Sequence, residues 1–240
     1  MKLIITENYE ELSERAAKTV IELVKNKPGS VLGLATGTTP LGLYARMIED
    51  YKLHGTSYSK VRTVNLDEYV GLDANHNQSY AYFMRKNLFE HIDIDLSNTH
   101  IENGVAESEK AECERYDRLL RSLPRDFQLL GLGSNGHIAF NEPGTSFEST
   151  THVVELTFST VRDNARLFSS IDEVPRKALT MGLQSIVEAK KILVLASGEN
   201  KADAVAKIMS GKITEELPAS ILLKHADCTL IVDKGAASKL

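Results

Sequence analysis

Several features that mark large classes of proteins are missing from this sequence. It contains only two cysteines, Cys113 and Cys228, which lie far apart and have no cysteine or histidine at metal-ligand spacing, so we expect free thiols. The seven histidines are scattered without an HExxH pattern, and we expect no bound metal. No apolar run approaches the roughly 20 residues of a membrane-spanning helix, so we expect no membrane partner.

The chain also lacks a block of basic charge and a recognisable targeting segment. Its 28 Lys and Arg and 33 Asp and Glu residues are interspersed and give a net charge of −5. Nucleic-acid-binding domains gather cations on one face, so we expect no nucleic-acid partner. The N-terminal MKLIITENYEEL has no long apolar core before a small-residue cleavage site. The sequence therefore predicts a cytoplasmic protein.

What the sequence does contain is an alternation of short apolar runs and amphipathic stretches, without repeats or linkers. The predicted strands are Lys2–Thr6, Ser30–Ala35, Val61–Leu66, Asp126–Leu132, Lys191–Ala196 and Cys228–Val232. The predicted helices are Tyr9–Asn26, Pro40–Tyr51, Ser79–His91, Glu107–Ser122, Pro175–Ala189 and Asn200–Ser210. This alternation predicts one domain over residues 1–240, an α/β fold with a mostly parallel twisted sheet and helices on both faces in three layers.

Polar residues follow four of the predicted strands. They are Thr36-Gly37-Thr38-Thr39, Asp67-Glu68, the segment from Gly133 to Glu142, and Ser197 to Lys201. Ligands of parallel α/β sheets bind beyond the carboxyl ends of the strands, so we expect these groups to converge on one cleft if the strands are neighbours.

The loop Thr36–Thr39 has the composition of a phosphate cradle. A glycine permits close approach of the backbone, and the helix predicted to begin at Pro40, with Thr39 as its N-cap, would offer unpaired N–H groups. An ordinary helix cap is an equally good interpretation of this loop alone. Lys201 could add a cation, although a lysine at a helix start is usually a solvated surface residue.

Gly131-Leu132-Gly133-Ser134-Asn135-Gly136 matches the GxGxxG dinucleotide fingerprint. A nucleotide-binding unit needs a helix directly after the last glycine, and Pro143-Gly144 leaves too little room for one. We favour a catalytic turn, in which Glu142 lies near enough to orient and charge the His137 imidazole. For His137, a purely structural role is the alternative, and it is the commoner one for histidines in general. For Asp67, the alternative is a helix cap or a surface turn, which is the commoner place for aspartates.

Five segments together resemble the glucosamine-6-phosphate deaminase family. They are LATGTTPLGLY (34–44), NLDEYVGL (65–72), SYAYFM (79–84), GLGSNGHIAFNEPG (131–144) and VRDNARLF (161–168). The resemblance implies a Rossmann-like fold of the sugar-phosphate isomerase type. It also implies a hydrolase acting on a C–N bond in amino-sugar catabolism, which converts glucosamine 6-phosphate and water to fructose 6-phosphate and ammonia without a cofactor.

Residue roles follow from the same resemblance. Asp67 would be the base that moves a proton from C2 to C1 through an enolamine, while His137, paired with Glu142, would open the sugar ring. Thr36, Gly37, Thr38, Thr39, Arg166 and Lys201 would bind the phosphate. Residues 156–175 would form a mobile lid that brings Arg166 onto the phosphate.

Two departures from the family pattern alter these expectations. Asn135 stands where many members have an aspartate, so the pH dependence of His137 should differ from theirs. The segment Thr151-His152-Val153-Val154 lacks the cations of the allosteric hexameric members. We therefore predict an unregulated enzyme that acts as a monomer.

Two other functions remain open. A 6-phosphogluconolactonase would share the fold and a glycine-rich histidine loop, although NLDEY and NEP favour the deaminase. A non-catalytic sugar-phosphate sensor would bind the ligand without turnover.

Overall fold

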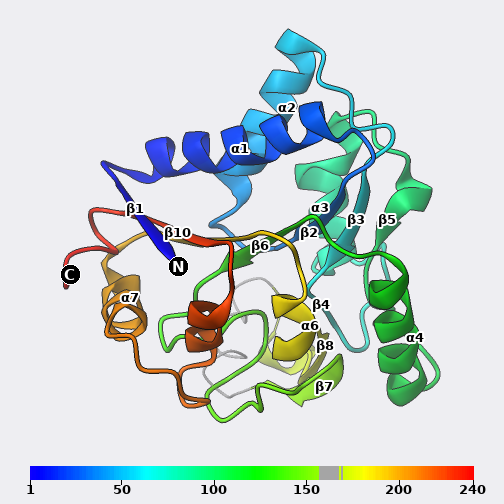
Figure 1. Ribbon diagram of the computed structural model, residues 1–240. Helices are drawn as coiled ribbons and strands as arrows, with labels where there is room; N and C mark the ends of the chain where they lie inside the picture. The colour runs from blue at the N-terminus through cyan, green and yellow to red at the C-terminus, as the bar shows by residue number, and fades with distance from the viewer. Residues whose placement is uncertain (157–167, 169) are drawn as a thin grey trace.

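The computed structural model describes residues 1–156, 168 and 170–240. A seven-stranded sheet in the order β1-β10-β9-β6-β2-β3-β5 forms the middle layer (Figure 1). Its strands are β1 (Lys2–Thr6), β2 (Val31–Leu34), β3 (Arg62–Asn65), β5 (Thr99–His100), β6 (Phe127–Gly131), β9 (Ile192–Ala196) and β10 (Cys228–Asp233). Every neighbouring pair is parallel. The six predicted strands are present, and the two-residue edge strand β5 was not predicted.

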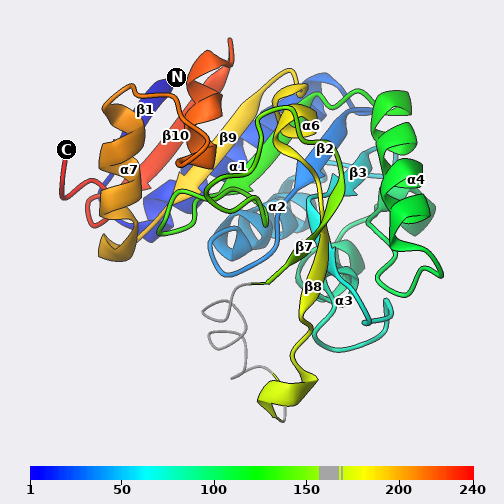
Figure 2. The same ribbon diagram turned by 90° about the horizontal axis from the view of Figure 1, so that it is seen from below.

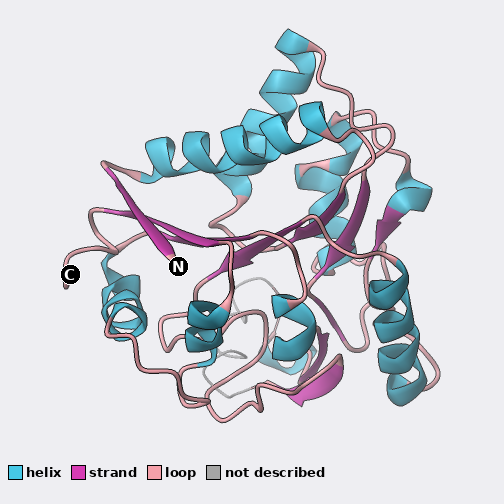
Figure 3. Ribbon diagram, viewed as in Figure 1, coloured by secondary structure: helices cyan, strands magenta, loops and turns pink. Residues whose placement is uncertain are grey.

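Helices cover both faces of this sheet. They are α1 (Tyr9–Asn26), α2 (Leu41–His54), α3 (Tyr80–Asn87), α4 (Glu109–Ser122), α6 (Leu183–Val187) and α7 (Ala202–Met209). Short 3-10 turns are η1 (Phe89–His91), η2 (Leu96–Asn98), η4 (Ile171–Glu173), η5 (Glu199–Lys201) and η6 (Pro218–Lys224). Figures 1 and 3 show α1 and α2 on one side of the sheet and α6 and α7 on the other, which is the expected three-layer α/β arrangement.

Helix α1 illustrates how local sequence fixes an element. The Asn8 side chain accepts a hydrogen bond from the Glu11 N–H and so caps the first turn. Leu12, Ala16 and Val20 recur at helical spacing and are fully buried against the sheet. The predicted and observed bounds of this helix agree because its cap and its apolar stripe are both local signals.

A second sheet, with strand order β4-β8-β7, was not predicted. It is antiparallel and consists of β4 (Asp67–Tyr69), β8 (Lys177–Thr180) and β7 (His152–Glu155) (Figure 2). The predicted helix Pro175–Ala189 is therefore wrong in its first half. Buried Ala178 and Leu179 pair with strands on both sides. Gly182 packs so tightly on the Ser149 carbonyl that the helix begins only at Leu183.

Two boundaries near the predicted cleft also differ from expectation. Helix α2 begins at Leu41, with Pro40 in the capping position and no capping side chain, so Thr39 is not its N-cap. Strand β3 ends at Asn65, and Asp67 belongs to β4 rather than to the end of the parallel strand. The chain therefore passes from one sheet to the other directly before Asp67.

The main hydrophobic core lies against the seven-stranded sheet, and a smaller cluster around Tyr69, Leu72 and Ala178 lies beneath the second sheet. Cys113 and Cys228 are free and buried, as expected. Within the described part of the chain, no helix combines the length and apolar character that crossing a membrane requires.

Candidate active site

A cleft of about 440 Å³ opens at the carboxyl ends of β2, β6 and β9 and beside β4. Its lining includes the loop Thr36–Thr39, Asp67, His137 and Lys201, which come from four separate regions of the sequence. These regions converge because β2, β6 and β9 are direct neighbours in the parallel sheet, and because β3, which leads into β4 directly before Asp67, pairs with β2. Asn135 and Glu142 lie behind the cleft, next to His137.

The floor of the cleft contains a buried carboxyl group, Asp67, which is only 7% exposed. Burial, and then the neighbouring charge of Glu68, raise the pKa of Asp67 to about 8. A carboxyl with this pKa accepts a proton more strongly than an exposed one. It is therefore suited to general base catalysis near neutral pH.

Glu68 points away from the cleft and joins β4 to α3. Its carboxylate accepts hydrogen bonds from the backbone N–H groups of Tyr69 at 2.8 Å and of Tyr80 and Ala81 at 2.9 Å. Burial raises the pKa of Glu68 to about 7 even though these donors act in the opposite direction. No role was predicted from the sequence for Glu68, which is 1% exposed.

The glycine-rich segment after β6 forms a tight turn. The Gly133 N–H donates to the His137 carbonyl at 2.9 Å, and the Gly136 N–H donates to the Gly133 carbonyl at 3.0 Å. Gly136 has a φ of +88°, which favours glycine. Gly133 has no side chain because the His137 ring packs against its Cα, where a Cβ would lie 2.4 Å from the ring. The glycines therefore place the imidazole.

Glu142 lies beside the imidazole, with its Oε1 3.5 Å from His137 Nδ1. Asn135 Nδ2 donates to Glu142 Oε2 at 2.6 Å, and Asn135 Oδ1 accepts from the His137 backbone N–H at 3.1 Å. Asn135 thus contacts the carboxylate and the backbone of the turn rather than the imidazole ring. The contact with His137, and then Asn135, lower the pKa of Glu142, so an anion lies next to the ring.

No helix occurs anywhere between residues 132 and 151, all of which the structure describes. The dinucleotide interpretation of GxGxxG therefore fails, because the pyrophosphate would have no helix N-terminus behind the glycines. Instead the turn closes with a bridge between Ile138 and Asn141. The fully buried Asn141 side chain donates to the Ile138 and Met181 carbonyls.

The opposite side of the cleft can accommodate an anion. Gly37, at φ +91°, leaves open space around its Cα. Lys201, in η5, is partly buried, and this burial lowers its pKa. In the described lining of the cleft it is the only lysine or arginine. Arg166 and most of residues 156–175 lie outside the described residues.

Aromatic residues that the sequence analysis did not select also line the cleft. Tyr80 and Phe140 stack with their ring planes 7° apart and their centroids 6.2 Å apart. Tyr80 begins α3 immediately after the Ser79 cap, which was the available signal. Both rings line the same cleft as Asp67.

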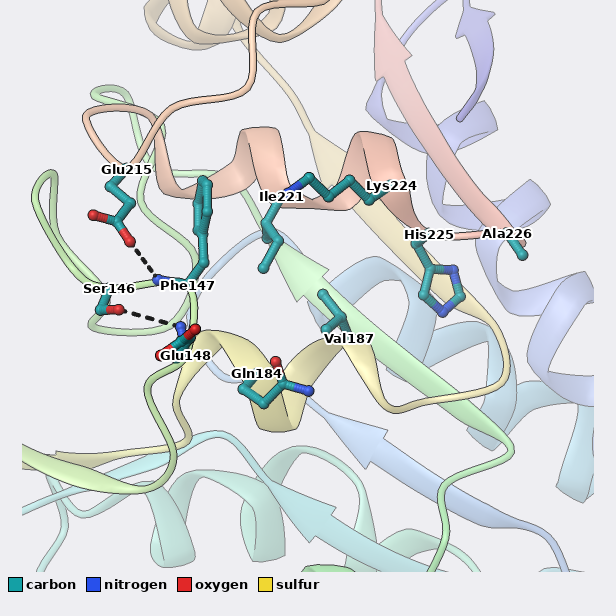
Figure 4. A pocket seen from close by; sticks show the side chains of 10 residues that line it. All are labelled: Ser146, Phe147, Glu148, Gln184, Val187, Glu215, Ile221, Lys224, His225 and Ala226. Carbon is teal, nitrogen blue, oxygen red and sulfur yellow. Dashed lines mark hydrogen bonds between the residues drawn. The ribbon is translucent and has the colours of Figure 1, made fainter.

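A second, larger hollow of about 790 Å³ lies away from the cleft, between the 146–148 segment, α6 and η6 (Figure 4). It shares no lining residue with the cleft. Phe147 lies beneath Lys224 in this hollow, and its N–H donates to Glu215. The polar side chains that line this hollow include both acidic and basic ones, and we assign the hollow no role in the chemistry.

The fold and the cleft define an open, parallel-sheet α/β protein with carboxyl, imidazole and lysine side chains gathered at the carboxyl edge of the sheet. A family model described as glucosamine-6-phosphate isomerases/6-phosphogluconolactonase matches residues 6–231. The chain therefore belongs to this family.

Similar proteins include a glucosamine-6-phosphate deaminase of Clostridium perfringens, 55% identical over all of both chains. One from a Geobacillus species is 54% identical and covers 99% of this chain and 95% of its own. A solved structure of a monomeric glucosamine-6-phosphate deaminase is 50% identical, covers all of both chains and superposes with a TM-score of 0.97. The 6-phosphogluconolactonase of Trypanosoma brucei, 21% identical with a TM-score of 0.79, shares the fold.

Proposed function

We propose that this protein is a glucosamine-6-phosphate deaminase, which converts glucosamine 6-phosphate and water to fructose 6-phosphate and ammonia. The observation that carries the proposal is the buried Asp67 carboxyl, with its raised pKa, in one cleft with His137 and the loop Thr36–Thr39. The full-length similarity to deaminases supports the same activity.

In this proposal Asp67 takes the C2 proton of the open-chain sugar and returns it to C1. The electron pair of the broken C–H bond forms the C1=C2 bond of the enolamine while the C1 carbonyl oxygen takes up a proton from water, and protonation at C1 leaves an iminium at C2. The proton taken up at this oxygen is returned to water when the iminium is hydrolysed. Water then adds to C2, and the nitrogen leaves as ammonia. The raised pKa of Asp67 keeps the transferred proton on the carboxyl between the two steps.

His137 opens the pyranose ring by moving a proton between the C1 hydroxyl and the ring oxygen. Glu142 Oε1, 3.5 Å from His137 Nδ1, orients the imidazole for this transfer. Asn135 orients Glu142 through the 2.6 Å hydrogen bond and adds no charge of its own. The phosphate would bind among Thr36, Gly37, Thr38, Thr39 and Lys201, with Arg166 as a further ligand.

The decisive experiment is to incubate the purified protein with glucosamine 6-phosphate and measure ammonia and fructose 6-phosphate. We expect both products in equal amounts. Turnover of 6-phosphogluconolactone without ammonia release would instead assign the lactonase activity. Binding of glucosamine 6-phosphate without either reaction would indicate a sensor.

We also propose that the enzyme acts as a monomer in the cytoplasm. The monomeric state is supported by the near-identical backbone of the monomeric deaminase. Light scattering of the purified protein tests it, because a dimer or hexamer would have at least twice the 26.5 kDa mass of the chain.

A further inference from the structure

Two side chains outside the cleft are bonded to the loops of its proposed phosphate side. The first is Tyr9, at the start of α1. Its hydroxyl lies 3.1 Å from the Thr38 carbonyl and 3.0 Å from the Thr39 carbonyl, and it accepts a hydrogen bond from the Gly42 N–H at 2.8 Å. One hydroxyl therefore links the loop to the first turn of α2.

This link depends on a close approach between α1 and α2. A Cβ at Gly42 would lie 2.2 Å from Ser13 Oγ and 3.0 Å from Tyr9 Oη, so only glycine admits the tyrosine at this position. The Thr38 carbonyl also accepts from the Leu41 N–H at 3.3 Å. Tyr9 therefore adds a second contact to the Thr38 carbonyl, where the internal hydrogen bond of the loop is long.

The second side chain is Asp233, the last residue of β10. It accepts hydrogen bonds from Ser197 Oγ at 2.5 Å, from the Gly198 N–H at 3.0 Å and from the Ala236 N–H at 2.8 Å. Burial would raise the pKa of Asp233, but these donors outweigh it and lower the pKa. The ionised carboxylate thus fixes the turn that leads to Lys201.

The turn that Asp233 holds in front of Lys201 has a backbone conformation that favours glycine. Gly198 has a φ of +92° and is followed directly by η5, which carries Lys201. On the other side, Gly235 packs so closely that a Cβ there would lie 3.2 Å from the Glu199 N–H nitrogen. The C-terminal end of β10 and the Lys201 turn are therefore one connected unit.

We infer that Tyr9 and Asp233 are positioning residues for the substrate phosphate, each fixing from outside the cleft one of the two loops that bind it. The inference rests on the proposed function. A loop that is ordered before binding loses less conformational entropy when it closes around an anion, so affinity rises without any new contact to the ligand. The phosphate takes no part in bond breaking, so we expect the ordered loops to affect KM more than kcat.

Tyr9→Phe removes one oxygen atom and leaves the packing of the ring in place. We expect the KM for glucosamine 6-phosphate and the inhibition constant of inorganic phosphate to rise together by about 3- to 10-fold, the range for one hydrogen bond. The kcat should stay within about twofold. Tyr51→Phe is the matched control, since Tyr51 lies on α2 and its hydroxyl has no hydrogen-bond partner among the described residues.

Asp233→Ala should give the same pattern with a larger effect, because three hydrogen bonds are lost. Asp233→Asn should restore most of the affinity, since its carbonyl oxygen still accepts from backbone N–H groups and Ser197 Oγ can accept from the amide. Asp227→Ala is the control, because Asp227 is exposed and directly precedes β10 at the end opposite to Asp233.

The outcomes separate the two proposals. If the wild-type protein releases no ammonia, the proposed function is wrong. If the wild type is active and both variants keep the wild-type KM and phosphate inhibition constant, the positioning role is wrong. A fall in kcat without a change in either constant would also overturn it, because that pattern indicates general damage to the fold.

Discussion

At the scale of single residues, the chemistry of the cleft depends on the different surroundings of neighbouring carboxyl groups, namely their burial and their hydrogen-bond donors. Asp67 lines the cleft, and no backbone N–H among the described residues donates to its carboxyl, whereas Glu68 receives three N–H groups. Glu102 is 2% exposed, and neither of its carboxyl oxygens has a hydrogen-bond partner among the described residues. Glu68 therefore has three backbone donors that stabilise its anion.

For Asp67, we predict that Asp67→Asn lowers kcat by about 10²- to 10⁴-fold, the usual contribution of a general base, with little change in KM. The wild-type kcat/KM should fall as pH decreases below about 8, because the base must be ionised and its pKa is raised to that value. Steady-state kinetics from pH 5 to 9 test both points. A rise in KM alone would contradict the assignment of the base.

For Glu102, burial and then the charge of Asp67 raise the pKa well above its usual value. The folded chain therefore retains a proton that the unfolded chain releases near pH 4.5, and stability is lost as pH rises above that point. Glu102→Gln has no titratable group at this position, so the variant does not lose stability in this way as pH rises.

The melting temperature of Glu102→Gln should exceed that of the wild type by about 3 °C or more at pH 8. The difference should vanish near pH 4, where the unfolded carboxyl is also protonated. Thermal melts at both pH values measure this, with the exposed Glu114→Gln as a control. An equal gain at both pH values would mean that packing, not proton release, is responsible.

At the scale of elements, β8 shows how tertiary pairing decides a local conformation. The sequence PRKALTMGLQSIVEA has helical spacing of apolar residues, which led to the wrong helix over Pro175–Ala189. Lys177–Thr180 instead fills the space between β4 and β7, where Ala178 and Leu179 are buried on pairing. Partners distant in sequence provide this stabilisation, and no local pattern contains them.

The junction between β8 and α6 gives a prediction of its own. A Cβ at Gly182 would lie 2.2 Å from the carbonyl oxygens of Ser149 and Thr150, which are backbone atoms with little freedom to move. We expect Gly182→Ala to lower the free energy of unfolding by about 1–3 kcal/mol, the range for overpacking. Urea denaturation measures it. Gly29→Ala, where a Cβ meets nothing within 4 Å, should be nearly neutral, and equal losses in both variants would contradict the steric explanation.

At the scale of the whole molecule, regulation is the property that the proposed monomer would lack. The segment from His152 to Glu155 forms β7 inside the second sheet and carries no Lys or Arg. We predict that N-acetylglucosamine 6-phosphate neither activates the enzyme nor changes the shape of its saturation curve. Initial rates across substrate concentrations, with and without this compound, test the prediction. A sigmoidal curve that the compound makes hyperbolic would overturn it.

The sequence by itself determined the parallel sheet, because its six longer strands are short apolar runs that alternate with amphipathic stretches, and polar residues follow four of them. It also determined which groups could meet at the cleft, since parallel strands place their carboxyl ends at one edge. The roles of Asp67, His137, Glu142 and the phosphate-binding residues stay predictions until the variants are measured.

Only the tertiary structure decided the second sheet, the burial of Asp67 and the contacts of Asn135. Burial raises a pKa through the removal of water by residues from many parts of the chain, so Asp67 and an exposed aspartate look alike in sequence. Glu68, Tyr9 and Asp233 were also absent from the predicted site, because their contacts form only in the folded chain. Apart from the short-range contacts with Tyr69 and Ala236, their hydrogen bonds reach residues from 12 to 36 positions away along the chain, and only the folded chain brings those partners together.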